Sequence, residues 1–228
     1  MKQFSKSTLL PVFVTALAFS AVVVAAEPVP PPSLPDEITA PPTLRFKPAS
    51  RLTMGRFVAR FESTTLSQVI KAAGLGNIEH HGDAGNSIYW LCYTIPGEGT
   101  SQRVWIIAHG EMGGSDHSIT EVIAMRLSSD TKSSDGCPNL PKRLQPLSLD
   151  RGIWLNTSAS QLTRVLGKPS ESRDDWRVYY YLGKVPGKYQ GPRDQGERVV
   201  QFDESSLLET RVVEGKVVTL QAAKLTTN

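Results

Sequence analysis

The chain has 228 residues, of which 39% are hydrophobic and 21% charged, and its formal net charge is +3. So small an excess of Lys and Arg argues against a nucleic-acid-binding surface, which concentrates positive charge on one face. The chain has only two cysteines and four histidines, so any site built from thiols or imidazoles depends on very few residues.

Residues 1–26 have the three regions of a secretory signal peptide. Lys2 and Lys6 begin it, an apolar run from Leu9 to Val24 follows, and small residues at 24–26 predict cleavage before Glu27. A retained membrane anchor is the alternative, but the run is short for a span of roughly 20 apolar residues. We therefore expect a periplasmic or secreted protein with no stable membrane insertion.

Residues 27–43 are rich in proline. Positions 28–42 read PVPPPSLPDEITAPP, in which seven of fifteen residues are proline. Proline has no backbone N–H and cannot join a helix or sheet interior, so this stretch predicts an extended polyproline linker. The folded part then begins near Leu44, and its length suits one large domain or two small ones.

Two similar segments, 44–140 and 141–228, follow the linker. Each contains a short helical pattern, and the apolar positions Leu66, Val69 and Ile70 of the first match Leu162, Val165 and Leu166 of the second. Thr65 and Ser158 are suitable N-caps, because a hydroxyl accepts a hydrogen bond from a free backbone N–H of the first turn. Gly74 and Gly167 are suited to ending the two helices.

Strand patterns follow each helix. They cover residues 88–93, 104–108 and 119–127 in the first segment, and 178–182, 199–202, 208–213 and 217–225 in the second. Glu214-Gly215 predicts a tight hairpin between the last two of these strands. The predicted fold class is α+β, with two tandem units that each consist of a helix and an antiparallel meander. A helix would cover one face of each sheet and leave the other face free.

The stretch GIWLNTSASQLTRVLGKPSESRDDWRVYYYL resembles the small outer-membrane lipoprotein of the β-barrel assembly machinery. The positions that carry the resemblance are Gly152, Thr157, Gln161, Val165, Leu166, Gly167, Pro169, Trp176, Tyr179 and Tyr180. Two such units in tandem resemble the secreted β-lactamase-inhibitor protein. The resemblance implies a non-enzymatic module that binds another protein of the envelope, although no lipoprotein cysteine follows the signal peptide.

The two cysteines allow two interpretations. Cys92 could be a nucleophile, with His80, His81 or His109 as its base. Its apolar neighbours do not favour a thiolate, and two cysteines in an exported chain most simply pair. We expect a Cys92–Cys137 disulfide, which closes a loop of about 45 residues and stabilises the fold by about 4 kcal/mol in the chain-entropy model.

The histidines offer a weak metal site, and the best placed are His81, His109 and His117. Imidazole is a ligand for zinc or copper. However, His80 and His81 are neighbours, and neighbours on a strand point to opposite faces. Polar residues of loops and strand edges are the better interpretation, so we expect no cofactor.

The stretch VWIIAHGEMGGS is similar to the oxyanion loop of the α/β-hydrolases. That fold also requires a Gly-x-Ser-x-Gly elbow, which the chain lacks. The glycines are better explained as turn residues.

Aromatic residues on the predicted strands are candidates for a binding surface. We selected Tyr89, Trp105, Tyr180 and Phe202, which would either line an open sheet face or form part of the core. The predicted function is a non-enzymatic, exported protein-binding module of the bacterial envelope. The alternative is a small envelope hydrolase that uses Cys92 or a histidine-bound metal.

Overall fold

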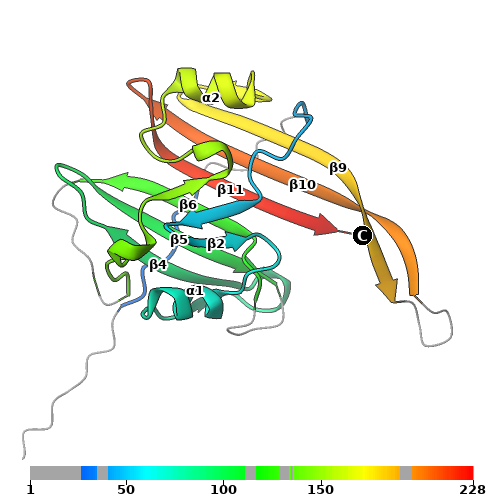
Figure 1. Ribbon diagram of the computed structural model, residues 1–228, viewed down its shortest axis with the longest axis horizontal. Coiled ribbons are helices and arrows are strands. Elements are labelled where there is room, and N and C mark those ends of the chain that lie inside the picture. Colours follow the sequence, from blue (N-terminus) through cyan, green and yellow to red (C-terminus); the bar gives the residue numbers. More distant parts are fainter. Residues whose placement is uncertain are drawn as a thin grey trace, which may run out of the picture.

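The computed structural model describes residues 27–34, 41–110, 117–128, 134, 136–190 and 197–227. Its largest element is an eight-stranded antiparallel sheet in the order β3-β4-β5-β6-β11-β10-β9-β8 (Figure 1). The strands are β3 (Glu79–His81), β4 (Ile88–Ile95), β5 (Ser101–His109), β6 (Glu121–Leu127), β8 (Glu171–Arg173), β9 (Trp176–Gln190), β10 (Glu197–Val213) and β11 (Lys216–Thr227). The predicted signal peptide lies outside the described residues.

A smaller antiparallel sheet packs on one face of the large one. Its strands, in the order β2-β1-β7, are β1 (Arg51–Met54), β2 (Phe57–Arg60) and β7 (Leu147–Leu149). Two helices, α1 (Leu66–Ala73) and α2 (Ala159–Leu166), lie at the bottom and the top of the view in Figure 1. Neither of them is long and apolar enough to cross a membrane, nor is any other helix in the part of the chain that the structure describes.

Both helices begin and end where the local sequence predicts. Thr65 caps α1 through its side chain, which accepts a hydrogen bond from the backbone N–H of Gln68, and the Gln68 side chain bonds back to Thr65. Ser158 caps α2 by accepting from Gln161 N. Gly74 ends α1 with φ 75°, a left-handed conformation that glycine adopts without strain. The predicted hairpin at Glu214-Gly215 joins β10 to β11.

The predicted fold class is wrong. Of the described residues, 51% are in strands and 14% in helices, so the protein is mostly β rather than α+β with two helix-plus-meander repeats. Strands from the two predicted segments join each other, because β6 pairs with β11 in the large sheet and β1 pairs with β7 in the small one. Each helix has only eight residues, whereas β9, β10 and β11 have 15, 17 and 12.

The large sheet has two chemically different faces. The inner face packs against both helices and the small sheet, and forms the main core with residues such as Leu91, Ile106 and Tyr179. The outer face carries a second, smaller cluster of Trp90, Cys92, Trp105, Ile107, Ile123 and Cys137. The two clusters alternate along β4 and β5, as expected for strands that bury both faces.

Strands β9 and β10 continue past the end of β11 as a twisted two-stranded ribbon (Figure 1). Pairing between β10 and β11 stops at Asp203, whereas pairing between β10 and β9 continues to Glu197. The outer edge of β9 carries Lys184, Pro186 and Lys188 along the ribbon. Proline and lysine on an edge strand discourage pairing with further strands, so this edge is protected against aggregation.

Candidate protein-binding surface

The predicted disulfide is confirmed. Cys92 on β4 and Cys137 are bonded, 45 residues apart in the sequence, and the described residues contain no free cysteine. The loop around Cys137 is also tied to β4 by hydrogen bonds, since Thr94 Oγ1 donates to the carbonyl oxygen of Cys137 over 3.0 Å. A bonded sulfur is no nucleophile, so the hydrolase alternative loses its thiolate.

The N-terminal proline-rich segment covers the outer face in the first half of the sheet. Trp90 Nε1 and Trp105 Nε1 both donate to the carbonyl oxygen of Val29, each over 3.0 Å. The side chains of Val29 and Leu34 pack against the outer cluster. We call residues 27–34 the strap. These residues belong to the predicted proline-rich linker, 27–43, and they lie against the sheet.

The four aromatic candidates do not share one face. Trp105 lies on the outer face and is only 3% exposed. Tyr180 is also on the outer face, half-buried, at the edge where its carbonyl accepts from Thr43 N. Tyr89 and Phe202 alternate to the other side, where Tyr89 stacks between two histidine rings. The aromatic residues therefore do not form a continuous wall.

The three histidine candidates lie apart. His81 is exposed at the end of β3. His117 stacks on the Tyr89 ring with centroids 4.8 Å apart. His109 bonds to Glu121, with 2.6 Å between Nε2 and Oε2. Among the described residues, no three His, Cys, Asp or Glu side chains are close enough together to hold a metal ion.

An exposed apolar area occupies the outer face in the second half of the sheet. Leu182 on β9 and Leu225 on β11 both lie opposite Ser205 on β10, so the three side chains form one row across the sheet. Leu182 is 47% exposed and Leu225 51% exposed. The next row contains Tyr180, Leu207 and Ala223, all half-buried. We call these six residues the apolar rows.

Leu182 and Leu225 are not among the residues predicted from the sequence to form a binding surface, which are all aromatic. Both leucines lie in strands, where the face that each side chain takes depends on register. The usable signal was alternation along β11, where Leu220 and Ala222 belong to the core and Leu225, three residues beyond Ala222, falls on the other face. Alternation assigns Leu225 to the outer face only once the face of a neighbouring residue, such as Ala222, is known.

Polar side chains separate the strap from the apolar rows. The Glu121 carboxylate accepts from His109 through one oxygen, and through the other from Gln221 Nε2 over 2.6 Å. These three residues line a pocket of about 220 Å³ beneath Pro31 and Leu34. Glu209 lies opposite Gln221 on the next strand and is 4% exposed. Burial, reinforced by the charges of Glu121 and Glu171, raises the pKa of Glu209 to about 7.

The raised pKa predicts a pH-dependent effect of Glu209→Gln. A carboxyl group whose pKa is raised by folding makes its full contribution to the free energy of unfolding below its unfolded pKa. That contribution is lost as the pH rises through the folded pKa, which is about 7 for Glu209. At pH 8 the wild-type protein must therefore bury a charge at a cost of roughly 3 kcal/mol. We expect Glu209→Gln to raise the free energy of unfolding by up to about this amount at pH 8 and to change it little at pH 4.

Urea denaturation at pH 4, 6 and 8 measures this effect. Glu98→Gln is the matched control, because Glu98 is exposed and should change stability little at any of these pH values. A Glu209→Gln variant whose difference from wild type is the same at all three pH values would contradict the prediction.

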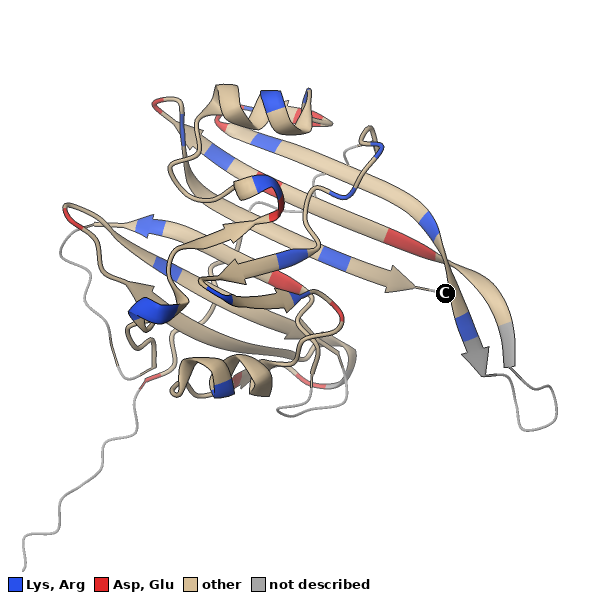
Figure 2. Cartoon of the chain, viewed as in Figure 1, with Lys and Arg blue, Asp and Glu red and all other residues tan. Residues whose placement is uncertain are grey.

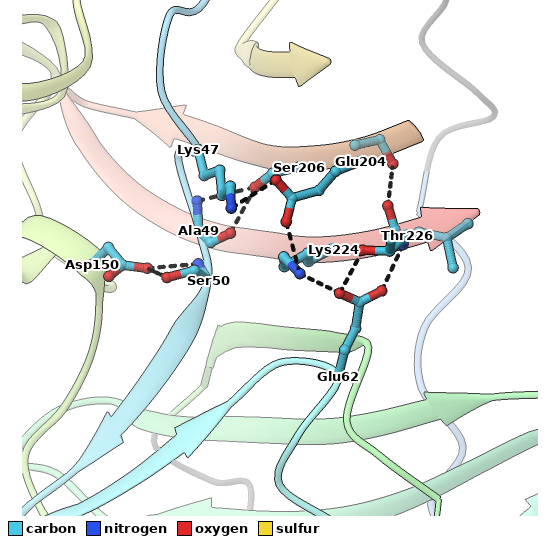
Figure 3. Close-up of polar contacts among 11 residues, drawn as sticks. Lys47, Ala49, Ser50, Glu62, Asp150, Glu204, Ser206, Lys224 and Thr226 are labelled. Atoms are coloured by element: carbon cyan, nitrogen blue, oxygen red, sulfur yellow. Dashed lines mark hydrogen bonds and ion pairs between the residues drawn. The ribbon is translucent and has the colours of Figure 1, made fainter. Parts of the chain in front are cut away.

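An ion-pair network fixes the base of the ribbon on the inner side (Figure 3). The Glu204 carboxylate on β10 lies 2.6 Å from Lys47 Nζ and 3.0 Å from Lys224 Nζ. Lys224 on β11 also pairs with Glu62, whose carboxylate accepts from Thr226 N over 2.6 Å. The network connects four parts of the chain, namely the segments around Lys47 and Glu62 and the strands β10 and β11. Its two lysines and two glutamates balance in charge, so it leaves no net charge for a ligand.

The network shifts two pKa values. Burial acts to raise the pKa of Glu204, but the bonds from Lys47 and Lys224 outweigh it and hold that pKa below its usual value. Burial acts to lower the pKa of Lys224, but its bonds to Glu62 and Glu204 outweigh it and raise that pKa. Both groups are therefore held in their charged forms at neutral pH.

Elsewhere charges of both signs are interspersed along the described strands and loops (Figure 2). The apolar rows contain no charged residue. No protein family model matches the chain, and neither a curated protein nor a solved structure is significantly similar to it.

Proposed function

We propose that this protein is a non-enzymatic, exported binding module of the bacterial cell envelope, which holds an extended apolar segment of a partner protein on the outer face of its sheet. The observation that carries the proposal is the pair of half-exposed leucines, Leu182 and Leu225, in one row of that face. Exposed aliphatic side chains that cluster on a sheet are characteristic of interaction surfaces.

The strap supports an extended segment as the ligand. In the first half of the sheet, the outer face is covered by residues 27–34 of the chain itself, which pack apolar side chains on it. The apolar rows continue the same face across β11, β10 and β9. A partner segment that places apolar side chains over Leu182 and Leu225 would bury the same kind of surface in the same way.

The compartment is part of the proposal. A disulfide persists in an oxidising environment such as the periplasm or the extracellular space. The signal-peptide pattern of residues 1–26 and the resemblance of residues 152–182 to the envelope assembly lipoprotein agree with that location. The partner that we propose is accordingly another envelope protein, and neither a nucleic acid nor a membrane is needed.

The proposal predicts that Leu182→Asp with Leu225→Asp abolishes partner binding without unfolding the protein. Both side chains are about half exposed, so aspartate remains hydrated in the free protein but would be buried without a partner charge in the complex. We expect binding to weaken by at least about 30-fold, which corresponds to the 2 kcal/mol of an interface hot spot, with little change in melting temperature. Crosslinking and affinity capture from native envelopes, with hydrogen exchange of the captured complex, measure the effect.

Val58→Asp is the control, because Val58 is 39% exposed but lies on the small sheet. We expect the Val58 variant to capture the partner as wild type does and the double leucine variant to fail to capture it. In the complex, β9 and β11 should gain protection from hydrogen exchange. Equal capture by all three proteins would place the binding surface elsewhere.

A further inference from the structure

The strap has the chemistry of a polyproline ligand. Residues 28–32 read Pro-Val-Pro-Pro-Pro, so four of these five residues lack a backbone N–H. A polyproline II segment makes no internal hydrogen bonds and presents its carbonyl oxygens to the surroundings. The Val29 carbonyl has no partner within the segment, and it accepts hydrogen bonds from two indole N–H groups at once.

The part of the outer face under the strap presents two indole donors to such a segment, and we call the surface around Trp90 and Trp105 the groove. Trp90 and Trp105 lie on the neighbouring strands β4 and β5, and Trp105 is opposite the disulfide-bonded Cys92. The indole N–H groups therefore converge from two strands on one carbonyl. Gly136, next to the disulfide-bonded Cys137, also lies against the strap, since a Cβ on it would be 2.4 Å from the carbonyl oxygen of Glu27. Aromatic grooves with indole donors are a general means of binding proline-rich segments.

The strap is also weakly attached. Glu27, Pro28, Pro30 and Ser33 are exposed. Among the described residues, the strap makes no backbone–backbone hydrogen bond with the rest of the chain. A pocket of about 220 Å³ remains between the strap and the sheet. Two indole hydrogen bonds and the packing of side chains such as Val29 and Leu34 hold the strap in place.

We propose that the Trp90–Trp105 groove is a binding site for proline-rich peptides, and that residues 28–34 are a resident ligand that a second proline-rich segment can displace. Covalent connection gives the strap an effective concentration in the groove of order millimolar, so it excludes weaker competitors. The groove would open to a partner that competes with the strap or pulls it away. This inference uses residues other than the apolar rows and does not depend on the proposed function.

The test uses the full chain with a weakened strap, the double variant Val29→Gly with Leu34→Gly. The probe is a synthetic peptide with the sequence EPVPPPSL, residues 27–34. We expect a saturable change in tryptophan fluorescence when the peptide is added to this variant. The wild-type chain should bind the peptide at least tenfold more weakly, because its own strap competes.

Two further comparisons test the chemistry of recognition. Trp105→Phe in the weakened-strap background keeps a ring but loses one donor, and should weaken peptide binding at least fivefold. Trp154→Phe is the matched control, because the Trp154 indole donates to Gln102 Oε1 away from the groove and its loss should leave peptide affinity unchanged. A peptide with its four prolines replaced by alanine should bind at least tenfold more weakly.

The inference is overturned if the peptide binds the weakened-strap variant no better than wild type, if the two tryptophan variants lose affinity equally, or if the alanine peptide binds as well. If the weakened-strap variant does not fold, a second measurement on the wild-type chain tests the same inference. A protease site placed in residues 35–40 of the wild-type chain lets the strap be cut free after folding. The strap should then dissociate on dilution while the circular dichroism of the body stays native, and unfolding on its release would make the strap a structural element instead.

Discussion

Replacing Cys92 by serine should lower the free energy of unfolding by about 4 kcal/mol, the chain-entropy value for a loop of this size. The bond joins residues 45 apart, so its loss frees a large part of the unfolded chain. It should also loosen the loop whose Gly136 approaches the strap. Urea denaturation of wild type and variant under oxidising conditions gives the difference.

Reduced wild-type protein is the internal control. With a reductant present, its urea midpoint should approach that of Cys92→Ser, because both then lack the same constraint. Protein purified without reductant should contain no thiol that can be alkylated. Two reactive thiols per chain, or a variant within 1 kcal/mol of wild type, would contradict the structural role of the bond.

Removing the Glu204 carboxylate should have an effect of similar size. Glu204→Ala takes away the shared partner of Lys47 and Lys224, and the Lys224 side chain is only 13% exposed. Removal of one member of a buried ion pair typically costs 3–5 kcal/mol. Lys224 keeps its pair with Glu62 while Lys47 loses its carboxylate, so the lower end of this range applies. We expect a loss of about 3 kcal/mol at pH 7, measured by urea denaturation.

The pH profile of this loss follows from the two pKa shifts. The lowered pKa of Glu204 contributes stability above its unfolded value, and this contribution is lost as the pH falls through the folded value. The raised pKa of Lys224 contributes stability below its unfolded value, and this contribution is lost as the pH rises through the folded value. The gap between wild type and Glu204→Ala should therefore be widest around neutral pH and narrow in acid.

Asp203→Ala is the control for this experiment. Asp203 precedes Glu204 on the same strand and also pairs with a lysine, Lys184, but both side chains are well exposed, at 48% and 62%. An exposed pair contributes roughly 0–1 kcal/mol. If the two variants lose equal stability at pH 7, the network is no stronger than a surface ion pair.

The predictions that succeeded rest on local chemistry. Thr65 and Ser158 cap helices because a hydroxyl three residues from a free N–H needs no distant partner. Glu214-Gly215 turns the chain between β10 and β11, where both residues have positive φ. The disulfide followed from a pair of cysteines in a chain whose first 26 residues predict export, since an oxidising compartment favours their pairing.

The fold class and the aromatic surface needed information that a local pattern does not contain. A strand pattern does not specify which other strand pairs with it, so the joining of β6 to β11 was not predictable from either segment alone. Alternation along a strand separates two faces but does not say which one is buried. For that reason Tyr89 and Trp105 were grouped together, although they occupy opposite faces.

By itself, the sequence determined the helix ends, the last hairpin, the positions of most strands and the cysteine pair, because each depends on residues that are close in the chain or on composition. The tertiary structure alone decided that the strands merge into one sheet, that the strap lies on Trp90 and Trp105, and that Leu182 and Leu225 are exposed. Val29 is 61 and 76 residues from the two tryptophans that bind it. Contacts over such separations form only when the whole sheet brings the residues together, and no local propensity specifies them.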